Sequence, residues 1–208
     1  MTTLSTRSLA LLFILVVAVP VAHATVIAVP DQQTWRSDVG SSFQVDFDAF
    51  TGPVSNQYPG VVFSPFNDGS PSSIAQYPYE GNNSMFTSGV ESGGGGGWAA
   101  DFDTPTSGVA MWVGDVQFPG TMISFYDSAH QIRATFDLLE SGTGDGPAVY
   151  GFNGYTSDSP DIARVEITIN PSDAVWFDNV QFGIRTEASV PDRSAGRMSW
   201  GHVRSLFR

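Results

Sequence analysis

The chain has 208 residues, a formal net charge of −12 at pH 7 and no cysteine. The lack of cysteine excludes a disulfide framework and cysteine-based chemistry within these residues. Residues 25–185 hold four arginines and 19 acidic residues, which gives this part a formal charge of −15. Nucleic acid is therefore an unfavourable partner, because binding to phosphates requires a basic surface. An acidic surface suits export and divalent cations.

The first 24 residues have the pattern of a secretory signal peptide. Arg7 precedes an apolar run at 9–21, and residues 22–24 read Ala-His-Ala, which fits a cleavage site. We therefore expect residues 1–24 to be removed and the protein to be secreted or held at the cell surface. The alternative is an uncleaved N-terminal anchor. No later segment is apolar enough to span a bilayer.

The N-terminal third of the remaining chain contains few regular patterns. We expect 25–41 to be a loosely packed extension, because it is polar and carries one tryptophan, Trp35. Alternation over 42–49 predicts a strand with Phe43 and Phe47 on its buried face, and 61–63 predicts a second short strand. The region 65–97 is rich in Gly, Ser, Pro and Asn, and its five consecutive glycines at 93–97 predict a loop.

From residue 98 onward, alternation of apolar and polar residues predicts one strand after another. The predicted strands are 98–102, 109–113, 121–126, 131–138, 148–152, 162–170 and 175–184. The pair 121–126 and 131–138 flanks a short turn and predicts a hairpin. No window of 11 or more residues has a convincing helical period. This spacing predicts one all-β domain at 42–185, a two-sheet antiparallel β-sandwich or jelly roll.

The last predicted strand, 175–184, contains the most unusual polar residue. Read at a strict period of two, Trp176, Asp178 and Val180 share one face with Phe182 and Ile184. That face is expected to be buried. A buried carboxylate is costly unless it is hydrogen-bonded, paired or bound to a cation. Asp178 is therefore expected to cap loop amides or to bind a metal ion.

The domain resembles exported bacterial β-sandwich domains. The resemblance is carried by VDFDAFTGPVSNQYPGVVFS at 45–64, WAADFDTPTSGVAMWVGD at 98–115, MISFYDSAHQI at 122–132 and IARVEITINPSDAVWFDNVQFG at 162–183. Such domains are common in proteins of the PEP-CTERM class, which exosortases sort, and are similar to the jelly rolls of carbohydrate-binding modules. Taken with the rest of the sequence, we expect a non-enzymatic module of the cell surface or extracellular matrix.

The C-terminal end departs from that family. Its members close with Val-Pro-Glu-Pro, an apolar helix and a basic cluster. Here Val190-Pro191 is followed by Asp192, and the remaining residues include four arginines but no apolar helix. We therefore expect 186–208 to be a disordered basic tail, left by a decayed sorting signal or a change of reading frame, and export to yield a protein without a membrane span.

A structural calcium ion is the first site hypothesis. Calcium takes six to eight oxygen ligands from carboxylates, amides and carbonyls. If the first and last strands pair as in a jelly roll, Asp46 or Asp48 approaches Asp178. In similar carbohydrate-binding modules, the acidic residue of the closing strand often ligates calcium, which implies this role for Asp178. The candidate ligands are Asp46, Asp48, Asp178 and Asn179, with Asn56 and Gln57 as further loop oxygens.

Polysaccharide binding is the second hypothesis. Sugars stack on exposed aromatic rings flanked by polar side chains. The candidate rings are those of Tyr58, Tyr77, Tyr79, Trp112 and Tyr155. The alternative is that these rings cover the core, as aromatic side chains usually do. In that case the protein is a purely structural surface protein without a small ligand.

Enzymatic activity is the least favoured hypothesis. His130 stands in a predicted turn beside Ser128, and the other two histidines lie in the signal and the tail. A nucleophilic triad and a zinc site therefore lack their components. A glycoside hydrolase needs only two suitably spaced carboxylates, but nothing singles out a pair among the glutamates Glu80, Glu91, Glu140 and Glu166.

Overall fold

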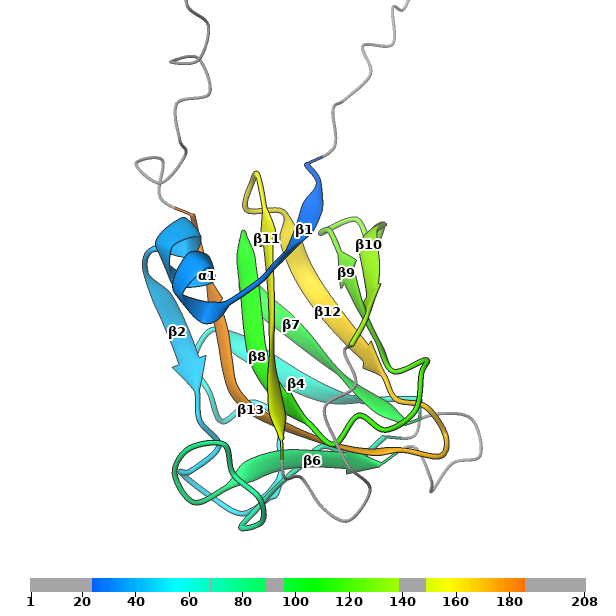
Figure 1. Ribbon diagram of the computed structural model, residues 1–208. Coiled ribbons are helices and arrows are strands. Elements are labelled where there is room, and N and C mark those ends of the chain that lie inside the picture. Colours follow the sequence, from blue (N-terminus) through cyan, green and yellow to red (C-terminus); the bar gives the residue numbers. More distant parts are fainter. Residues whose placement is uncertain (1–23, 68, 89–95, 139–148, 186–208) are drawn as a thin grey trace, which may run out of the picture.

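The computed structural model describes residues 24–67, 69–88, 96–138 and 149–185, and these form two antiparallel sheets packed face to face (Figure 1). The larger sheet has the order β1 (Val26–Val29), β11 (Tyr150–Ser157), β8 (Gly108–Gly114), β13 (Ala174–Gly183), β6 (Ser84–Ser88), β5 (Ser72–Ile74), β3 (Gly52–Pro53), and β2 (Ser42–Val45) also pairs with β13. The smaller sheet has the order β10 (Ile132–Asp137), β9 (Met122–Tyr126), β12 (Ile162–Thr168), β7 (Gly97–Thr106), β4 (Val61–Phe66). The predicted β-sandwich of jelly-roll type is confirmed.

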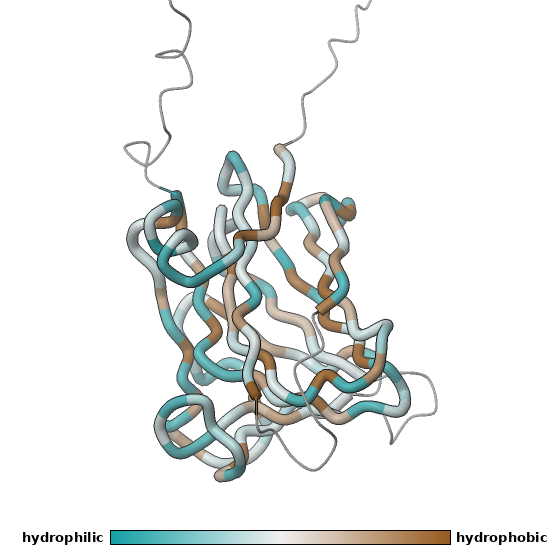
Figure 2. The backbone as a smooth tube through the Cα atoms, viewed as in Figure 1, coloured by the Kyte–Doolittle hydropathy of each residue, from teal (hydrophilic) through white to brown (hydrophobic). Residues whose placement is uncertain are grey.

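The core lies between the sheets, and Figure 2 shows hydrophobic and hydrophilic residues mixed along the strands on either side of it. The ring of Trp98 on β7 meets that of Phe177 on β13 edge-on, with centroids 5.2 Å apart. The strand patterns predicted from 98 onward account for most inward-facing residues. Buried side chains from these strands include Trp98, Ala100, Val109, Met111, Val113, Ile123, Phe125, Val165 and Ile167.

The structure corrects the prediction of which face of β13 is buried. Val180 and Phe182 lie in the core between the sheets, but so do Val175 and Phe177, so Trp176 and Asp178 point to the opposite face. The pairing of β13 with β8 shifts between Asp178 and Gln181, and Asn179 has a φ of 47°. This is a β-bulge, in which an extra residue reverses the alternation.

The end of β13 and two other strands also differ from prediction. Ile184 follows the strand and is exposed. The strand β2 ends at Val45, and Phe43 is 62% exposed, whereas Phe47 is buried as predicted. The predicted strand 131–138 is slightly shorter in the structure, where β10 spans Ile132–Asp137 and Ile132 at its start is exposed. All of these positions lie at strand ends, where periodicity is least informative.

The N-terminal segment is packed into the sandwich, contrary to the expectation of a loose extension. The strand β1 pairs with β11, and the helix α1 (Gln32–Val39) covers the outer face of the larger sheet at one end. Asp31 caps the helix by accepting the Thr34 N–H at 2.8 Å. Trp35 is fully buried and its Nε1–H donates to the Tyr155 carbonyl oxygen at 3.0 Å.

Two of the predicted segments fall largely outside the described part of the chain. The expected signal peptide extends only to residue 24, and the expected tail covers 186–208. Among the described residues, no helix is long and apolar enough to span a bilayer.

Candidate functional site

The loop between β5 and β6 lies on the outer face of the larger sheet, and its tyrosines meet aromatic rings of the strands below. Tyr79 lies flat on Trp112 of β8, with ring centroids 4.0 Å apart and planes at 13°. Tyr77 meets Trp176 of β13 edge-on at 5.1 Å. Tyr150 of β11 donates its hydroxyl to the Tyr77 carbonyl oxygen. We call these five residues the aromatic strip.

Two further rings extend the aromatic strip along the sheet. Phe86 of β6 packs on Trp176 with centroids 4.6 Å apart, and Phe152 of β11 meets Trp112 at 5.5 Å. Within the strip, Tyr77 is 50% exposed and Tyr79 is 39% exposed, whereas Trp176 is buried. The loop tyrosines therefore form the accessible surface, and the strand residues form the support beneath them.

Asp178 fixes this loop from below. The β-bulge turns its carboxylate toward the loop, where Oδ2 accepts the backbone N–H of Tyr79 at 2.9 Å and of Glu80 at 3.0 Å. Its Oδ1 accepts the N–H of Asn179 at 2.7 Å. The carboxylate is fully buried. Of the two roles predicted for Asp178, the structure therefore shows the capping of loop amides.

Asp48 holds the far end of the same loop. Its Oδ1 accepts the backbone N–H groups of Asn82 and Asn83 at 2.7 and 2.8 Å. Gly81 approaches so closely that a Cβ there would lie 1.9 Å from Asp48 Oδ2, and its φ is 73°. Carboxylates thus hold the loop at its middle and at its C-terminal end, which favours a defined position of Tyr79.

Burial is the largest cause of the pKa shifts of the ionisable groups beneath the aromatic strip. Loss of hydration raises the pKa of Asp178 from its ordinary value to about 6, and repulsion from Asp48 adds to this, while the three N–H bonds oppose it. Burial, with the charges of Asp46, Asp48 and Asp178, also raises the pKa of the Tyr58 phenol. Negative charge is therefore concentrated around the base of the loop.

The four predicted calcium ligands are engaged by hydrogen bonds within the protein. The side chain of Asn179 accepts from Gln44 and donates to Glu80 at 2.9 Å, and Asp46 Oδ1 accepts the Asp48 N–H at 3.2 Å. Within the described ranges, no three His, Cys, Asp or Glu side chains are grouped so that they could hold a metal ion. Calcium binding by these residues stays a prediction.

The predicted sugar-binding rings divide into two groups. Tyr77, Tyr79 and Trp112 are brought together in the aromatic strip. Tyr155 is buried in the core at 3% exposure. Tyr58 is half-buried and packs edge-on against core rings such as Phe63. These last two positions follow the alternative that aromatic side chains cover the core.

Trp176 and Tyr150 belong to the aromatic strip but were not predicted as ligand-binding residues. A strict period of two places Trp176 on the core face, whereas the bulge at Asn179 turns it to the outer face. The sequence signal for this bulge is the pair Asp178-Asn179, because Asp and Asn adopt a positive φ more readily than most residues. Tyr150 lies over Gly114 of β8, where a Cβ would be 3.0 Å from its ring.

The structure brings no pair of glutamates together in the part of the chain that it describes. Glu80 lies beside the aromatic strip, whereas Glu166 on the smaller sheet is paired with Arg164 at 2.8 Å. Glu91 and Glu140 lie outside the described residues. His130 stands in the β9–β10 turn with a φ of 56°. Glu80 and Glu166 are therefore not brought together as a pair of carboxylates.

No protein-family model and no curated protein matches this sequence. Among solved structures, the K2 cleaved adhesin domain of Lys-gingipain superposes with a TM-score of 0.52 at 12% identity, covering 69% of this chain and 100% of that domain. The fold is thus shared with a β-sandwich adhesin domain.

Two carbohydrate-binding modules superpose with lower scores. A family 29 module from Piromyces equi has a TM-score of 0.44 at 10% identity, covering 68% of this chain and 89% of the module. A family 22 xylan-binding domain from Paenibacillus barcinonensis has a TM-score of 0.44 at 12% identity, covering 72% and 96%. Because such scores are low, the comparison of folds depends on the adhesin domain.

Proposed function

We propose that the protein is an exported, non-enzymatic β-sandwich module that binds polysaccharide through Tyr77 and Tyr79. One observation carries this proposal: Tyr79 rests flat on Trp112 and still has 39% of its surface exposed. A ring supported on one face and open on the other can stack against the C–H face of a sugar. Tyr77, which is separated from Tyr79 by Pro78, adds a second exposed ring to this surface.

The negative charge of the domain disfavours one class of polysaccharide as the ligand. Residues 25–185 carry a formal charge of −15, so an anionic polysaccharide would be repelled. Glu80, which is exposed and accepts a hydrogen bond from Asn179 at 2.9 Å, lies beside the strip and offers its carboxylate oxygens to sugar hydroxyls. A neutral polysaccharide is therefore the proposed ligand class.

Binding can be tested by affinity electrophoresis in gels that contain neutral, anionic or cationic polysaccharides. We expect retardation by at least one neutral polysaccharide, lost in Tyr79→Ala and weakened in Tyr77→Ala. Phe118→Ala is the matched control, because Phe118 is also an exposed aromatic residue (42%) but lies in the β8–β9 loop. Equal retardation of all three variants, or none of the wild type, would contradict the proposal.

A purely structural role is the second candidate, and one observation favours it. Trp176 is 6% exposed beneath Tyr77, so the loop also covers apolar surface of the sheet. On this account Tyr79→Ala lowers stability without affecting any ligand. Thermal unfolding of the same variants, measured beside the electrophoresis, distinguishes the two roles.

We also propose that the protein is exported and that its domain is related to PEP-CTERM-associated domains. The support is the apolar run at 9–21 with its Ala-His-Ala site, and the sequence resemblance over 45–183. N-terminal sequencing of protein recovered outside the cell should start at Thr25. Recovery only in membranes, with residues 1–24 retained, would indicate the uncleaved anchor.

A further inference from the structure

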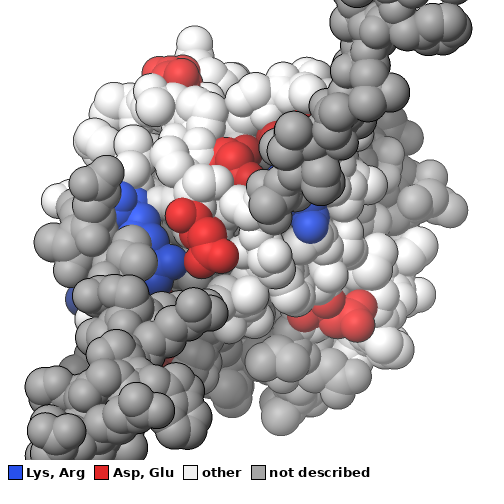
Figure 3. Space-filling view, turned by 90° about the horizontal axis from the view of Figure 1, so that it is seen from above, with Lys and Arg blue, Asp and Glu red and all other residues white. Residues whose placement is uncertain are grey.

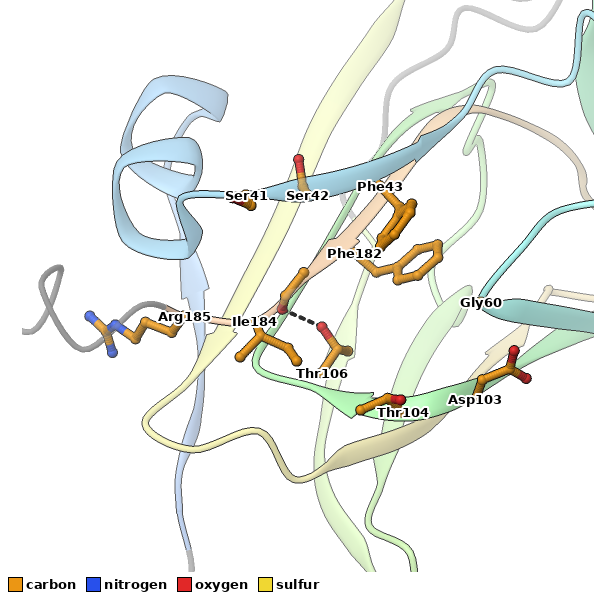
Figure 4. Close-up of a pocket in the computed structure, with 11 residues that line it drawn as sticks. Ser41, Ser42, Phe43, Gly60, Asp103, Thr104, Thr106, Phe182, Ile184 and Arg185 are labelled. Atoms are coloured by element: carbon orange, nitrogen blue, oxygen red, sulfur yellow. Dashed lines mark hydrogen bonds between the residues drawn. The ribbon is translucent and has the colours of Figure 1, made fainter.

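A groove of about 650 Å³ opens on the side of the sandwich, between the end of β13, β2 and the last residues of β7 (Figure 4). The rings of Phe43 and Phe182 stack on one side of it, with centroids 5.6 Å apart and planes at 21°. Ile184 and Thr106 line the other end, where Thr106 donates its hydroxyl to the Gly183 carbonyl oxygen. This groove is distinct from the aromatic strip, which lies on the outer face of the larger sheet.

The lining of the groove is unusually apolar for an exposed surface. Phe43 is 62% exposed and Ile184 is 47% exposed, and Phe182 extends the same surface inward. A contiguous apolar patch of this kind commonly marks an interaction site. Asp103, which is also exposed, adds a carboxylate at the rim.

Charge argues against a second copy of the chain as the occupant. Residues 25–185 carry a formal charge of −15, and like-charged copies repel each other. Three of the four arginines in this part are paired with acidic residues: Arg133 with Asp127 and Asp161, Arg164 with Asp101 and Glu166, and Arg185 with Asp38 and Asp158. Viewed from the end at which α1 lies, acidic side chains are scattered over the surface (Figure 3). An occupant with positive charge is favoured instead.

The segment 186–208 has the matching chemistry and starts at the groove. Ile184 and Arg185 line the groove, so the segment begins beside it. It holds four arginines against Glu187 and Asp192, a formal charge of +2. Its apolar side chains are concentrated near its end, at Met198, Trp200, Val203, Leu206 and Phe207.

We propose that the groove is the docking site of the chain's own segment 186–208. Apolar side chains of 198–207 pack against Phe43, Phe182 and Ile184, and the arginines of the segment face the acidic domain. Trp200 lies 15 residues beyond Arg185, and a chain of that length can reach up to about 50 Å. Because the segment is tethered beside the groove, its effective concentration there is on the order of millimolar.

The absence of cysteine allows a direct test in the full-length exported protein. We would introduce Ser42→Cys at the groove and Ser199→Cys in the segment, oxidise at low protein concentration, and measure intramolecular disulfide by mass spectrometry. The control pair is Ser128→Cys with Ser199→Cys, since Ser128 is exposed in the turn between β9 and β10. These two strands lie at the opposite edge of the view from β2 (Figure 1). We expect the first pair to form at least tenfold faster than the control.

Each other outcome overturns the proposal. Equal rates for the two pairs would show that the segment has no preference for the groove. Disulfides between two molecules from the groove pair alone would show that the groove takes a second copy. A third variant, Phe43→Ser in the groove pair, should remove the rate advantage, and unchanged rates would contradict docking on that ring. Phe43 is mostly exposed, so this substitution should leave the fold intact, which circular dichroism would verify.

A second measurement is independent of cysteine. If the segment covers Phe43 and Ile184, then Trp200→Ser in the full chain uncovers them and increases the fluorescence of an added apolar dye. The same substitution combined with Phe43→Ser should add nothing further, because the two residues act on one contact. Additive effects of the two substitutions would contradict the proposed contact.

Discussion

The carboxylate of Asp178 accepts the backbone N–H of Tyr79 at 2.9 Å, which ties the middle of β13 to the loop that carries the aromatic strip. A strand residue thus determines where an exposed loop ring lies. The bulge at Asn179 makes this possible, because it places Asp178 on the outer face while Val180 returns to the core. The burial of the carboxylate is offset by three N–H bonds.

Asp178→Ala should release the loop and destabilise the protein. The substitution leaves the N–H groups of Tyr79, Glu80 and Asn179 without their acceptor, and each buried unpaired donor costs about 1–3 kcal/mol. Water can reach part of the loop, so we expect the free energy of unfolding to fall by about 2–3 kcal/mol in total. Urea unfolding measures this, and hydrogen exchange should show faster exchange at Tyr79 and Glu80.

Asp137→Ala is the matched control for that substitution. Asp137 is exposed at the end of the edge strand β10, and surface substitutions usually change stability by less than about 0.5 kcal/mol. Unchanged exchange at Tyr79 in Asp178→Ala would show that the loop is held by Asp48 and ring packing alone.

The raised pKa of Asp178 predicts a dependence of stability on pH. The folded protein binds this proton more tightly than the unfolded chain does, with a pKa of about 6 against an ordinary value of 3.8. The contribution to stability is therefore fully present below about pH 3.8 and is lost as the pH rises through 6. Wild-type protein should be less stable at pH 7 than at pH 4.5 by at most about 2 kcal/mol from this group.

Asp178→Asn isolates that contribution, because the large negative charge of the domain also favours mild acid. The variant cannot ionise at this position, so its unfolding free energy should change less between pH 4.5 and 7 than that of the wild type. Below this window, the lowered pKa values of Asp31 and Asp127, which accept nearby backbone N–H bonds, act in the opposite direction. Identical slopes for the two proteins would assign the effect to overall charge.

Calcium binding stays a prediction, and a titration followed by thermal unfolding tests it. The charges of Asp46, Asp48 and Asp178 act together on Tyr58, and Asp48 also raises the pKa of Asp178. A cation would relieve this repulsion, so added Ca²⁺ should raise the Tm and chelator should lower it. Asp48→Asn should remove the response. No response to Ca²⁺ in the wild type would leave Asp178 with loop capping as its role.

The sequence predicts the sandwich well because several of its strands, β7 and β12 among them, carry their core residues at alternate positions. Trp98 and Ala100 on β7, and Val165 and Ile167 on β12, all lie in the core as the period of two requires. The fold therefore follows from binary patterning alone over much of the chain. Short elements are less predictable, since α1 offers only Trp35 and Val39 on its buried face.

The candidate site is less predictable because it depends on one irregular residue and on contacts distant in sequence. A single positive φ at Asn179 reverses the face of Trp176 and Asp178, and periodicity has no means to detect it. The stacking of Tyr79 on Trp112 joins a loop to a strand 33 positions later. Tyr77, Tyr79 and Trp112 were predicted for their residue type, whereas their grouping required the fold.

Trp35→Ala should detach the N-terminal segment from the sandwich. The indole is fully buried, its Nε1–H donates to the Tyr155 carbonyl oxygen, and a Cβ on Gly108 would lie 3.2 Å from its ring. Removing a large core aromatic typically costs about 3–5 kcal/mol. Urea unfolding should show a loss in this range, and the amides of β1 should lose protection from hydrogen exchange.

Ile27→Ala is the control for the same segment, because Ile27 on β1 is 52% exposed and should matter little. The strand β1 pairs only with β11 at the edge of the larger sheet, so its protection depends on α1 holding it in place. If Trp35→Ala lowers stability while β1 stays protected, the pairing of β1 with β11 is sufficient by itself, and α1 serves only to cover the sheet.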